Sequence, residues 1–207
     1  MEEAAKLGVF LTEDAADKLF AYKEFLKEYN TKVNLTSITD DEEIIIKHFL
    51  DSLTLMEYVD GGRLIDIGTG AGFPGVVLKI AAPHLDIVLM DSLNKRIKFL
   101  EQLVNILGIT GISCIHGRAE ELARRPEYHK KFDFATARAV TNLTKLAEYC
   151  LPYVKSGGMF LAMKGRNYHE ETNEAKPTIN RLGGRMLPPK EIVLPGGIVH
   201  TVIPILK

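Results

Sequence analysis

The stretch Arg63–Gly75, RLIDIGTGAGFPG, determines the fold that we expect for this chain. It joins an apolar run carrying one acid, Asp66, to a series of glycines, and the apolar run Val76–Leu78 follows it. Glycine permits positive φ and a close approach of backbone to a ligand, while a proline such as Pro74 suits the first turn of a helix. The stretch therefore predicts a buried strand, a tight turn and a helix whose free N–H groups favour a polar or anionic ligand.

Composition indicates a folded protein, because 46% of the 207 residues are hydrophobic and 26% are charged. No apolar run approaches the roughly 20 residues of a membrane span, so we expect no membrane partner. The N-terminus, MEEAAKLG, lacks the features of a secretory signal, and we expect a cytoplasmic location. Net charge is −1, which argues against non-specific nucleic-acid binding by bulk charge but allows a local basic face. Cys114 and Cys150 are expected to be free core thiols.

Two amphipathic helices are expected before the glycine turn, over residues 12–29 and 40–58, with Thr12 as the first N-cap. The polar residues between them predict a loop. We therefore expect residues 1–62 to form an N-terminal helical extension. It would pack on a Rossmann-like domain of residues 63–207 and form a single compact unit with it.

Strands and helices alternate after Arg63, which predicts a mostly parallel sheet with helices on both faces. The C-terminal runs 191–194 and 198–206 flank Pro195-Gly196-Gly197 and predict an antiparallel hairpin, with Pro204 at an edge or a strand end. The expected fold class is α/β and Rossmann-like. The expected strands cover 64–67, 86–90, 112–115, 132–137 and 159–163, and the expected helices cover 74–82, 93–107, 119–123, 143–151 and 168–182.

The glycine turn also indicates a cofactor. Its pattern, acid-x-Gly-x-Gly-x-Gly, is that of Rossmann-like S-adenosylmethionine-dependent methyltransferases and places candidate binding residues at Asp66, Gly68, Gly70 and Gly72. Asp66 could orient or neutralise a cationic amino-acid moiety. Gly70, Gly72 and Gly75 also fit the dinucleotide fingerprint, so an NAD(P)-dependent oxidoreductase stays an alternative. The acid within the strand and the additional Gly68 favour S-adenosylmethionine.

Two further strand ends could hold an adenosine. Asp91 ends the second expected strand, where a carboxylate can accept hydrogen bonds from ribose hydroxyls. A backbone N–H at Ala119, or the side chain of Glu120, could contact the adenine edge. The alternatives are structural: Asp91 capping the next helix with Ser92, and Glu120 as an acid in a first helical turn.

Arg138 follows the fourth expected strand, at the sheet edge where ligands of such folds bind. It could bind a phosphate or a guanine edge, or it could form an ion pair with a helix acid. Other basic residues could form an RNA-binding rim on this nearly neutral protein; they are Lys95, Arg96, Arg118, Lys164 and Arg166. The six histidines show no metal-ligand spacing, and we expect no metal.

Several motifs together resemble one family. They are Asn34-Leu35-Thr36, HFLDSL at 48–53, IDIGTGAGFPG at 65–75, DSLNKR at 91–96 and Ala137-Arg138-Ala139. This combination resembles the RsmG family (formerly glucose-inhibited division protein B), the bacterial 16S rRNA guanine-N7 methyltransferases, over nearly the whole chain. The resemblance implies a class I S-adenosylmethionine-dependent methyltransferase fold with a C-terminal antiparallel hairpin. It implies methylation of N7 of guanine 527, with cofactor contacts at Gly68, Phe73, Ala119, Glu120 and Arg138.

Methylation of guanine N7 requires no general base, because N7 is a bare lone-pair acceptor. We therefore expect direct in-line methyl transfer in which positioning supplies the rate, with Arg138 holding the guanine or a phosphate and Asn34 lining a guanine pocket. The expected partner is 16S rRNA within a structured small ribosomal subunit, bound by a monomer. A non-catalytic rRNA-binding or assembly factor with a vestigial pocket is the remaining alternative.

Overall fold

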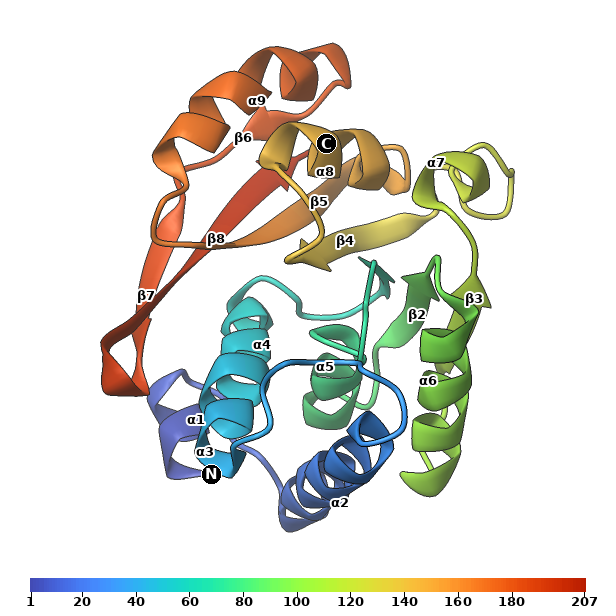
Figure 1. Cartoon of the computed structure of the whole chain (residues 1–207). Helices are drawn as coiled ribbons and strands as arrows, with labels where there is room; N and C mark the ends of the chain where they lie inside the picture. Colours follow the sequence, from blue (N-terminus) through green and yellow to red (C-terminus); the bar gives the residue numbers. More distant parts are fainter.

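The computed structural model describes residues 1–207, and an eight-stranded sheet runs through its centre (Figure 1). The strand order is β3-β2-β1-β4-β5-β8-β6, and β7 also pairs with β8. The strands are β1 (Arg63–Ile67), β2 (Asp86–Asp91), β3 (Ile112–His116), β4 (Phe132–Arg138), β5 (Val154–Gly165), β6 (Arg185–Met186), β7 (Lys190–Leu194) and β8 (Ile198–Leu206).

Strand pairing confirms the expected sheet. The first five strands pair in parallel, whereas β8 runs antiparallel to β5 and forms a hairpin with β7. Parallel pairing brings the carboxyl ends of β1, β2, β4 and β5 to one edge of the sheet, where ligands of such folds bind.

Side chains along the strands alternate between two cores, as the period of two in a strand requires. In β1, Leu64 packs into one cluster while Ile65 and Ile67 pack into the other. In β5, Leu161 and Met163 lie in the first cluster. A side chain near a strand end therefore faces the same core as the residues two and four positions away in that strand.

The first core lies under α5 (Gly75–Ala81), α6 (Asn94–Ile106) and the N-terminal segment. That segment contains α1 (Glu2–Lys6) and α2 (Glu13–Asn30), and then a continuous helical stretch. This stretch consists of α3 (Asp41–Ile44), the π-helix η1 (Ile45–Leu50), α4 (Asp51–Leu53) and the 3-10 helix η2 (Thr54–Glu57). Residues from the N-terminal segment and from the sheet share one hydrophobic cluster.

The second core lies under the helices on the opposite face, which are α7 (Ala119–Leu122), α8 (Leu143–Cys150) and α9 (His169–Arg181). The N-cap of α8 is Asn142, whose side chain accepts a hydrogen bond from the N–H of Lys145. Cys150 is buried in this core, and both cysteines are free. No helix of the structure is long and apolar enough to span a membrane.

The N-terminal helices confirm the expected pattern and add detail to it. Thr12 caps α2 by accepting a hydrogen bond from the N–H of Ala15 at 3.1 Å. The single helix expected over residues 40–58 is helical from Asp41 to Glu57, but its central turn is a π-helix. Such turns occur frequently at functional sites. The helix α1 was not expected.

The C-terminal region departs from expectation at Pro204. This residue lies within β8, an interior strand, and not at an edge or a strand end. The outer side of β8 pairs with β7 up to Val202 and with β6 from Ile205 onward. Pro204 thus occupies the gap between two pairing partners, where the missing N–H of proline breaks no ladder hydrogen bond.

Candidate functional site

The glycine turn between β1 and α5 is closely packed. Gly68 has φ +70° and Gly72 has φ +100°, a region that L side chains rarely adopt. A Cβ at Gly72 would lie 2.7 Å from Val76 and 2.8 Å from the hydroxyl of Tyr22. That hydroxyl donates a hydrogen bond to the carbonyl of Ala71, so α2 of the N-terminal segment directly supports the turn.

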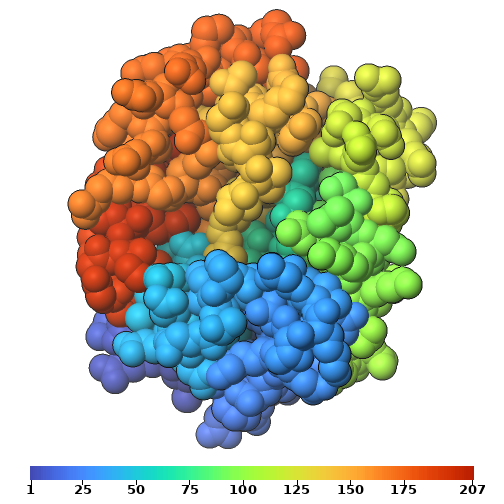
Figure 2. All heavy atoms as spheres, viewed as in Figure 1, coloured from blue at the N-terminus to red at the C-terminus, as the bar shows by residue number.

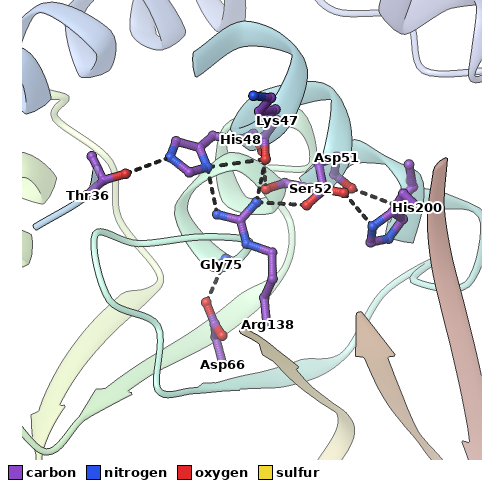
Figure 3. A network of polar contacts seen from close by, with 10 residues as sticks. Thr36, Lys47, His48, Asp51, Ser52, Asp66, Gly75, Arg138 and His200 are labelled. Atoms are coloured by element: carbon purple, nitrogen blue, oxygen red, sulfur yellow. Dashed lines mark hydrogen bonds and ion pairs between the residues drawn. The ribbon is translucent and has the colours of Figure 1, made fainter. Parts of the chain in front are cut away.

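Asp66 lies beneath this turn and is fully buried. Its Oδ2 accepts a hydrogen bond from the Thr69 hydroxyl at 2.7 Å. The same atom accepts a second hydrogen bond from the N–H of Gly75 at 2.9 Å (Figure 3). Burial raises the pKa of Asp66 to about 6, against the lowering effect of these hydrogen bonds. Its Oδ1 atom is buried without a protein partner. The carboxylate therefore holds the turn through Oδ2. Contact with the cofactor stays a prediction, and Oδ1 is the atom that has no protein partner and could make it.

Beside the turn lies a pocket of about 360 Å³, here called the Asp91 pocket. Figure 2 shows the surface hollowed near the centre of the view, where the β1–α5 region lies at depth behind the N-terminal segment. The pocket brings together the carboxyl ends of β1, β2 and β3; its lining includes Ile67, Gly68, Met90, Asp91, Gly117, Arg118, Ala119, Glu120 and Val140. Four of the residues expected to bind the cofactor thus line one pocket; they are Gly68, Asp91, Ala119 and Glu120. The other expected residues lie outside this lining; they are Asp66, Gly70, Gly72, Phe73 and Arg138.

Asp91 is almost fully buried, and both of its oxygens accept hydrogen bonds from the chain. Oδ2 accepts from the N–H of Gly70 at 2.9 Å and from Arg96 at 3.1 Å, and Oδ1 accepts from the N–H of Leu93 at 2.9 Å. Asp91 therefore links the glycine turn to the start of α6. A ribose contact stays a prediction, which the position of Asp91 in the pocket lining favours.

The Asp91 pocket suits an adenosine-containing cofactor. Its volume falls within the range of small-molecule sites. Its walls combine apolar surface, from Ile67, Met90 and Val140, with the polar groups of Asp91 and Glu120. The buried, unpartnered Oδ1 of Asp66 beneath the adjoining turn suits a cationic ligand. The residues present therefore fit S-adenosylmethionine.

Arg138 is the centre of a second arrangement, shown in Figure 3. Its Nη1 donates to the carbonyl of Lys47 at 2.9 Å and to Oδ2 of Asp51 at 2.7 Å, and its Nη2 contacts Nδ1 of His48 at 3.0 Å. The guanidinium carbon also lies 5.0 Å from the ring centroid of Phe73. The alternative interpretation of Arg138, an ion pair with a helix acid, is therefore confirmed. Its contact with a ligand stays a prediction.

His48 is held in one tautomer by this network. Nδ1 of His48 lies 3.0 Å from Nη2 of Arg138 and 3.2 Å from the carbonyl of Lys47, which already accepts from Nη1 of Arg138. A guanidinium only donates hydrogen bonds, so the shorter contact requires Nδ1 to accept from Arg138 and Nε2 to carry the proton. Nε2 then donates to the hydroxyl of Thr36 at 3.1 Å. Burial, together with the charge of Arg138, lowers the pKa of His48 to about 4. The ring, stacked on Phe73 with centroids 4.3 Å apart, is therefore neutral at pH 7.

Asp51 joins Arg138 to the C-terminal hairpin. Its Oδ1 lies 2.6 Å from Nδ1 of His200, and both side chains are about nine-tenths buried. Burial opposes ionisation, but the contacts with His200 and Arg138 outweigh it and hold the pKa of Asp51 below its usual value. One carboxylate thus connects the N-terminal segment, β4 and β8.

A second pocket of about 390 Å³ adjoins these residues and is here called the Arg138 pocket. It lies at the carboxyl ends of β4 and β5, opposite the Asp91 pocket across the segment Arg138–Val140. Ala139 lines the Arg138 pocket and Val140 lines the Asp91 pocket. Its lining includes Ile38, Lys47, His48, Asp51, Arg138, Ala139, Met163, Lys164, Gly165, Ile198, Val199 and His200.

The residues expected to bind RNA fall into two groups. Lys95, Arg118 and Arg166 are exposed and form no ion pair. Arg96 and Lys164 are engaged within the protein: Arg96 binds Asp91, and Lys164 binds Glu171 at 2.6 Å. Contact with RNA stays a prediction for all five residues.

Asn34 is exposed and lines neither pocket, so its role in a guanine site stays a prediction. A neighbouring residue, Asn30, shapes this loop instead. Its Oδ1 accepts hydrogen bonds from the N–H groups of Leu35 at 2.7 Å and Thr36 at 3.0 Å. Asn30 thereby sets the position of the hydroxyl that receives His48.

Three residues of this network were not predicted from the sequence as site residues: His48, Asp51 and His200. A local signal exists for the first two, since residues three positions apart share one face of a helix. A polar pair on the otherwise apolar face of this helix predicts a buried partner. His200 carries no local signal, because its contact with Asp51 depends on the pairing of β5 with β8.

Solved structures with the same architecture define the class of fold. A SAM-dependent methyltransferase from Aquifex aeolicus matches with a TM-score of 0.60 over 87% of this chain and 98% of its own, at 17% identity. A putative methyltransferase from Bacillus halodurans matches with a TM-score of 0.57 over 75% of this chain and 97% of its own, at 14% identity. The fold is thus that of the Rossmann-like class I methyltransferases, as expected.

Sequence relatives define the family within this class. A model of the family described as rRNA small subunit methyltransferase G matches residues 15–190. Proteins named Ribosomal RNA small subunit methyltransferase G from Clostridium kluyveri and Acetivibrio thermocellus are 48% and 47% identical, over 87% and 100% of this chain and 77% and 86% of their own lengths. The chain belongs to the rRNA small subunit methyltransferase G family. The resemblance drawn from the motifs is therefore confirmed.

Proposed function

We propose that this protein transfers the methyl group of S-adenosyl-L-methionine to N7 of guanine 527 in the 16S rRNA of the small ribosomal subunit. Its family supports this function, because the relatives carry the name of a small-subunit rRNA methyltransferase. One structural observation carries the proposal: two pockets adjoin at Arg138–Val140, and the Asp91 pocket has the lining of an adenosine site.

The chemistry makes few demands on the protein's own acids and bases. S-adenosylmethionine supplies, when bound, a methyl group on a positively charged sulfur. The lone pair of guanine N7 forms the new N–C bond as the C–S bond breaks, and the positive charge passes to the purine. No proton has to leave N7 first, so a neutral His48 and an ion-paired Asp51 are compatible with the reaction. The protein's task is to position two ligands.

Arg138 has the capacity to perform part of that positioning. A guanidinium has five N–H donors, and three contacts with Lys47, Asp51 and His48 hold Arg138 in place. The remaining two donors are free for a ligand oxygen, on the cofactor or on the guanine. Arg138→Ala should therefore reduce methyl transfer. Normal methylation, with normal affinity for cofactor and subunit, would show that Arg138 has no such role.

The proposed partner is the assembled small subunit, bound by a monomer in the cytoplasm. The net charge of −1 supports shape-dependent binding over bulk electrostatic attraction. The exposed Lys95, Arg118 and Arg166 would supply phosphate contacts, and these make binding sensitive to salt. Equal activity on a short isolated RNA hairpin would contradict the need for the assembled particle.

Methyl transfer provides the test. Purified protein, S-adenosylmethionine labelled in its methyl group and small subunits lacking the modification should give stoichiometric incorporation into 16S rRNA, whereas subunits that already carry the modification should accept none. Absence of incorporation would favour a non-catalytic assembly factor. Titration calorimetry with S-adenosylhomocysteine and with NAD addresses the other alternative, since binding of NAD alone would indicate an oxidoreductase.

A further inference from the structure

We propose that the Arg138 pocket binds the target purine after the base has left its stack, and that Gly165 forms the open floor on which the base lies. This inference rests on the proposed function and assigns the second substrate its own site. Enzymes that modify a base commonly extrude it into a fitted pocket, because the reacting atom is otherwise inaccessible.

The Arg138 pocket lies where substrates of parallel sheets bind. Arg138 is the last residue of β4 and Gly165 is the last residue of β5, so the pocket lies beyond the carboxyl ends of two adjacent parallel strands. Ala139 and Val140 are consecutive, yet the first lines the Arg138 pocket and the second lines the Asp91 pocket. A base in one pocket and a cofactor in the other would therefore meet at the boundary that these two residues form.

Residue 165 faces the side of the sheet on which the N-terminal segment packs. Met163 packs into the core beneath the N-terminal segment, so residue 165, two positions further along the strand, faces the same side. Gly165 pairs with His200 of β8, and paired residues share a face. His200 contacts Asp51 on that side. A Cβ at Gly165 would meet no atom within 4 Å, so the glycine leaves open the space above the floor.

The walls suit a flat aromatic ring. Ile38 comes from the loop of the N-terminal segment, and Ile198 and Val199 come from the start of β8. These apolar side chains, from opposite ends of the sequence, face a pocket whose polar groups lie around Arg138. A purine has apolar faces and polar edges, which matches this division.

The pairing of all three lysine and arginine side chains in the lining argues for a base and against a phosphate. Lys47 pairs with Glu43, Arg138 with Asp51, and Lys164 with Glu171. Each of these three cations in the lining is neutralised by a carboxylate, so the pocket offers no unpaired positive charge to an anion. A neutral base that becomes cationic on methylation is the better occupant.

Two contacts hold the pocket in shape. Asp51 binds His200, and Glu57 of η2 forms an ion pair with Lys190 of β7, so the N-terminal segment and the hairpin are joined at two points. Neither element belongs to the alternating βα core. The pocket is therefore built where two additions to that core meet.

Filling the floor tests the inference. Gly165→Leu should place its side chain in the pocket, and Gly61→Leu is a matched control, since a Cβ there also meets nothing within 4 Å and Gly61 lines neither pocket. We expect G165L to lower the single-turnover methylation rate by at least about 100-fold. Cofactor affinity, filter-binding affinity for the subunit and the thermal midpoint should change little, because the flipped base is a small part of the contact. G61L should match the wild type in all four.

The outcomes distinguish failure of the proposed function from failure of the base-binding site. If the wild-type protein does not methylate the subunit, the proposed function is wrong. If it does and G165L methylates at the same rate, the inference is wrong, as it is if G165L loses cofactor and methylation together while it stays folded. If G165L does not fold, Gly165→Ala and Ile38→Ala replace it. Both should slow methylation without weakening cofactor binding, and unchanged rates in both would overturn the inference.

Discussion

The contacts of Asp51 with Arg138 and His200 lead to a quantitative prediction about stability. Its carboxylate is about nine-tenths buried and lies 2.7 Å from Arg138 and 2.6 Å from His200. Asp51→Asn keeps the shape and one acceptor oxygen, but removes the charge that these partners face. The variant therefore leaves the Arg138 guanidinium buried without its counter-ion.

Removing one partner of a buried ion pair costs about 3–5 kcal/mol. Because asparagine retains an acceptor, we expect Asp51→Asn to lower the free energy of unfolding at pH 7 by about 3 kcal/mol, the lower end of that range. Substitution of Arg138 by methionine removes the unpaired charge as well. The double variant should therefore lose less than the sum of the two single changes, by about 1–3 kcal/mol.

Urea unfolding followed by far-ultraviolet circular dichroism measures these energies, since the chain contains no tryptophan for fluorescence. The exposed pair of Asp86 with Arg63, 2.8 Å apart, provides the control. Asp86→Asn should change the free energy of unfolding by about 1 kcal/mol at most, because exposed ion pairs contribute little. A loss for Asp51→Asn no larger than that of the control would refute the reasoning.

The stability difference between the wild type and Asp51→Asn should also depend on pH in a defined direction. The pKa of Asp51 is lowered in the folded state, so its stabilising effect is complete above the unfolded-state pKa of about 4 and is lost as pH falls through the lower folded-state pKa. The difference between wild type and D51N should therefore be constant from about pH 5 to pH 8 and shrink below about pH 4. A difference that instead changes around neutral pH would place the effect on another group.

Three further predictions concern the turn and the surface. The pKa of Asp66 is raised to about 6, so its ionisation destabilises the fold as pH rises from about 4 to 6. Asp66→Asn should flatten this decline in the free energy of unfolding, measured with urea. In the wild type, calorimetry should detect a gain in S-adenosylmethionine affinity between about pH 5 and 7, and Asp66→Asn should remove this gain. An unchanged pH profile in the variant would argue against both effects. Tyr22→Phe removes the buried hydrogen bond to Ala71 and should cost about 1–3 kcal/mol in urea unfolding; a neutral result would mean that α2 does not hold the turn through this hydroxyl. Replacing Lys95 and Arg118 by alanine should weaken binding to the small subunit and reduce the slope of log affinity against log salt by about 1 per residue, with no change in slope if neither contacts phosphate.

Patterns with a local cause were predictable from the sequence. The β1–turn–α5 unit, the alternation that follows it and the terminal hairpin all depend on spacing within a few residues. The Thr12 cap was also predictable, because an N-cap side chain bonds to a backbone N–H within the first turn of its own helix. The convergence of Asp91, Ala119 and Glu120 on one pocket followed from parallel pairing alone.

Features that depend on distant pairing were not predictable in this way. Pro204 was expected at an edge or a strand end because proline lacks an N–H, but the position is permitted by the change of partner from β7 to β6, which no local pattern records. Lys164 was expected on a basic rim, yet Glu171 in α9 neutralises it. The environment of Arg138 is set by residues 87 and 90 positions earlier in the chain, so its buried network needed the structure.

Chemical mapping of the methylated product tests the central claim most directly. 16S rRNA from small subunits treated with the protein and S-adenosylmethionine would be reduced with borohydride and cleaved with aniline, which breaks the chain at N7-methylguanosine. The account predicts one new cleavage, at guanine 527, that is absent without cofactor. Methyl incorporation without this cleavage, or cleavage at another guanine, would contradict it.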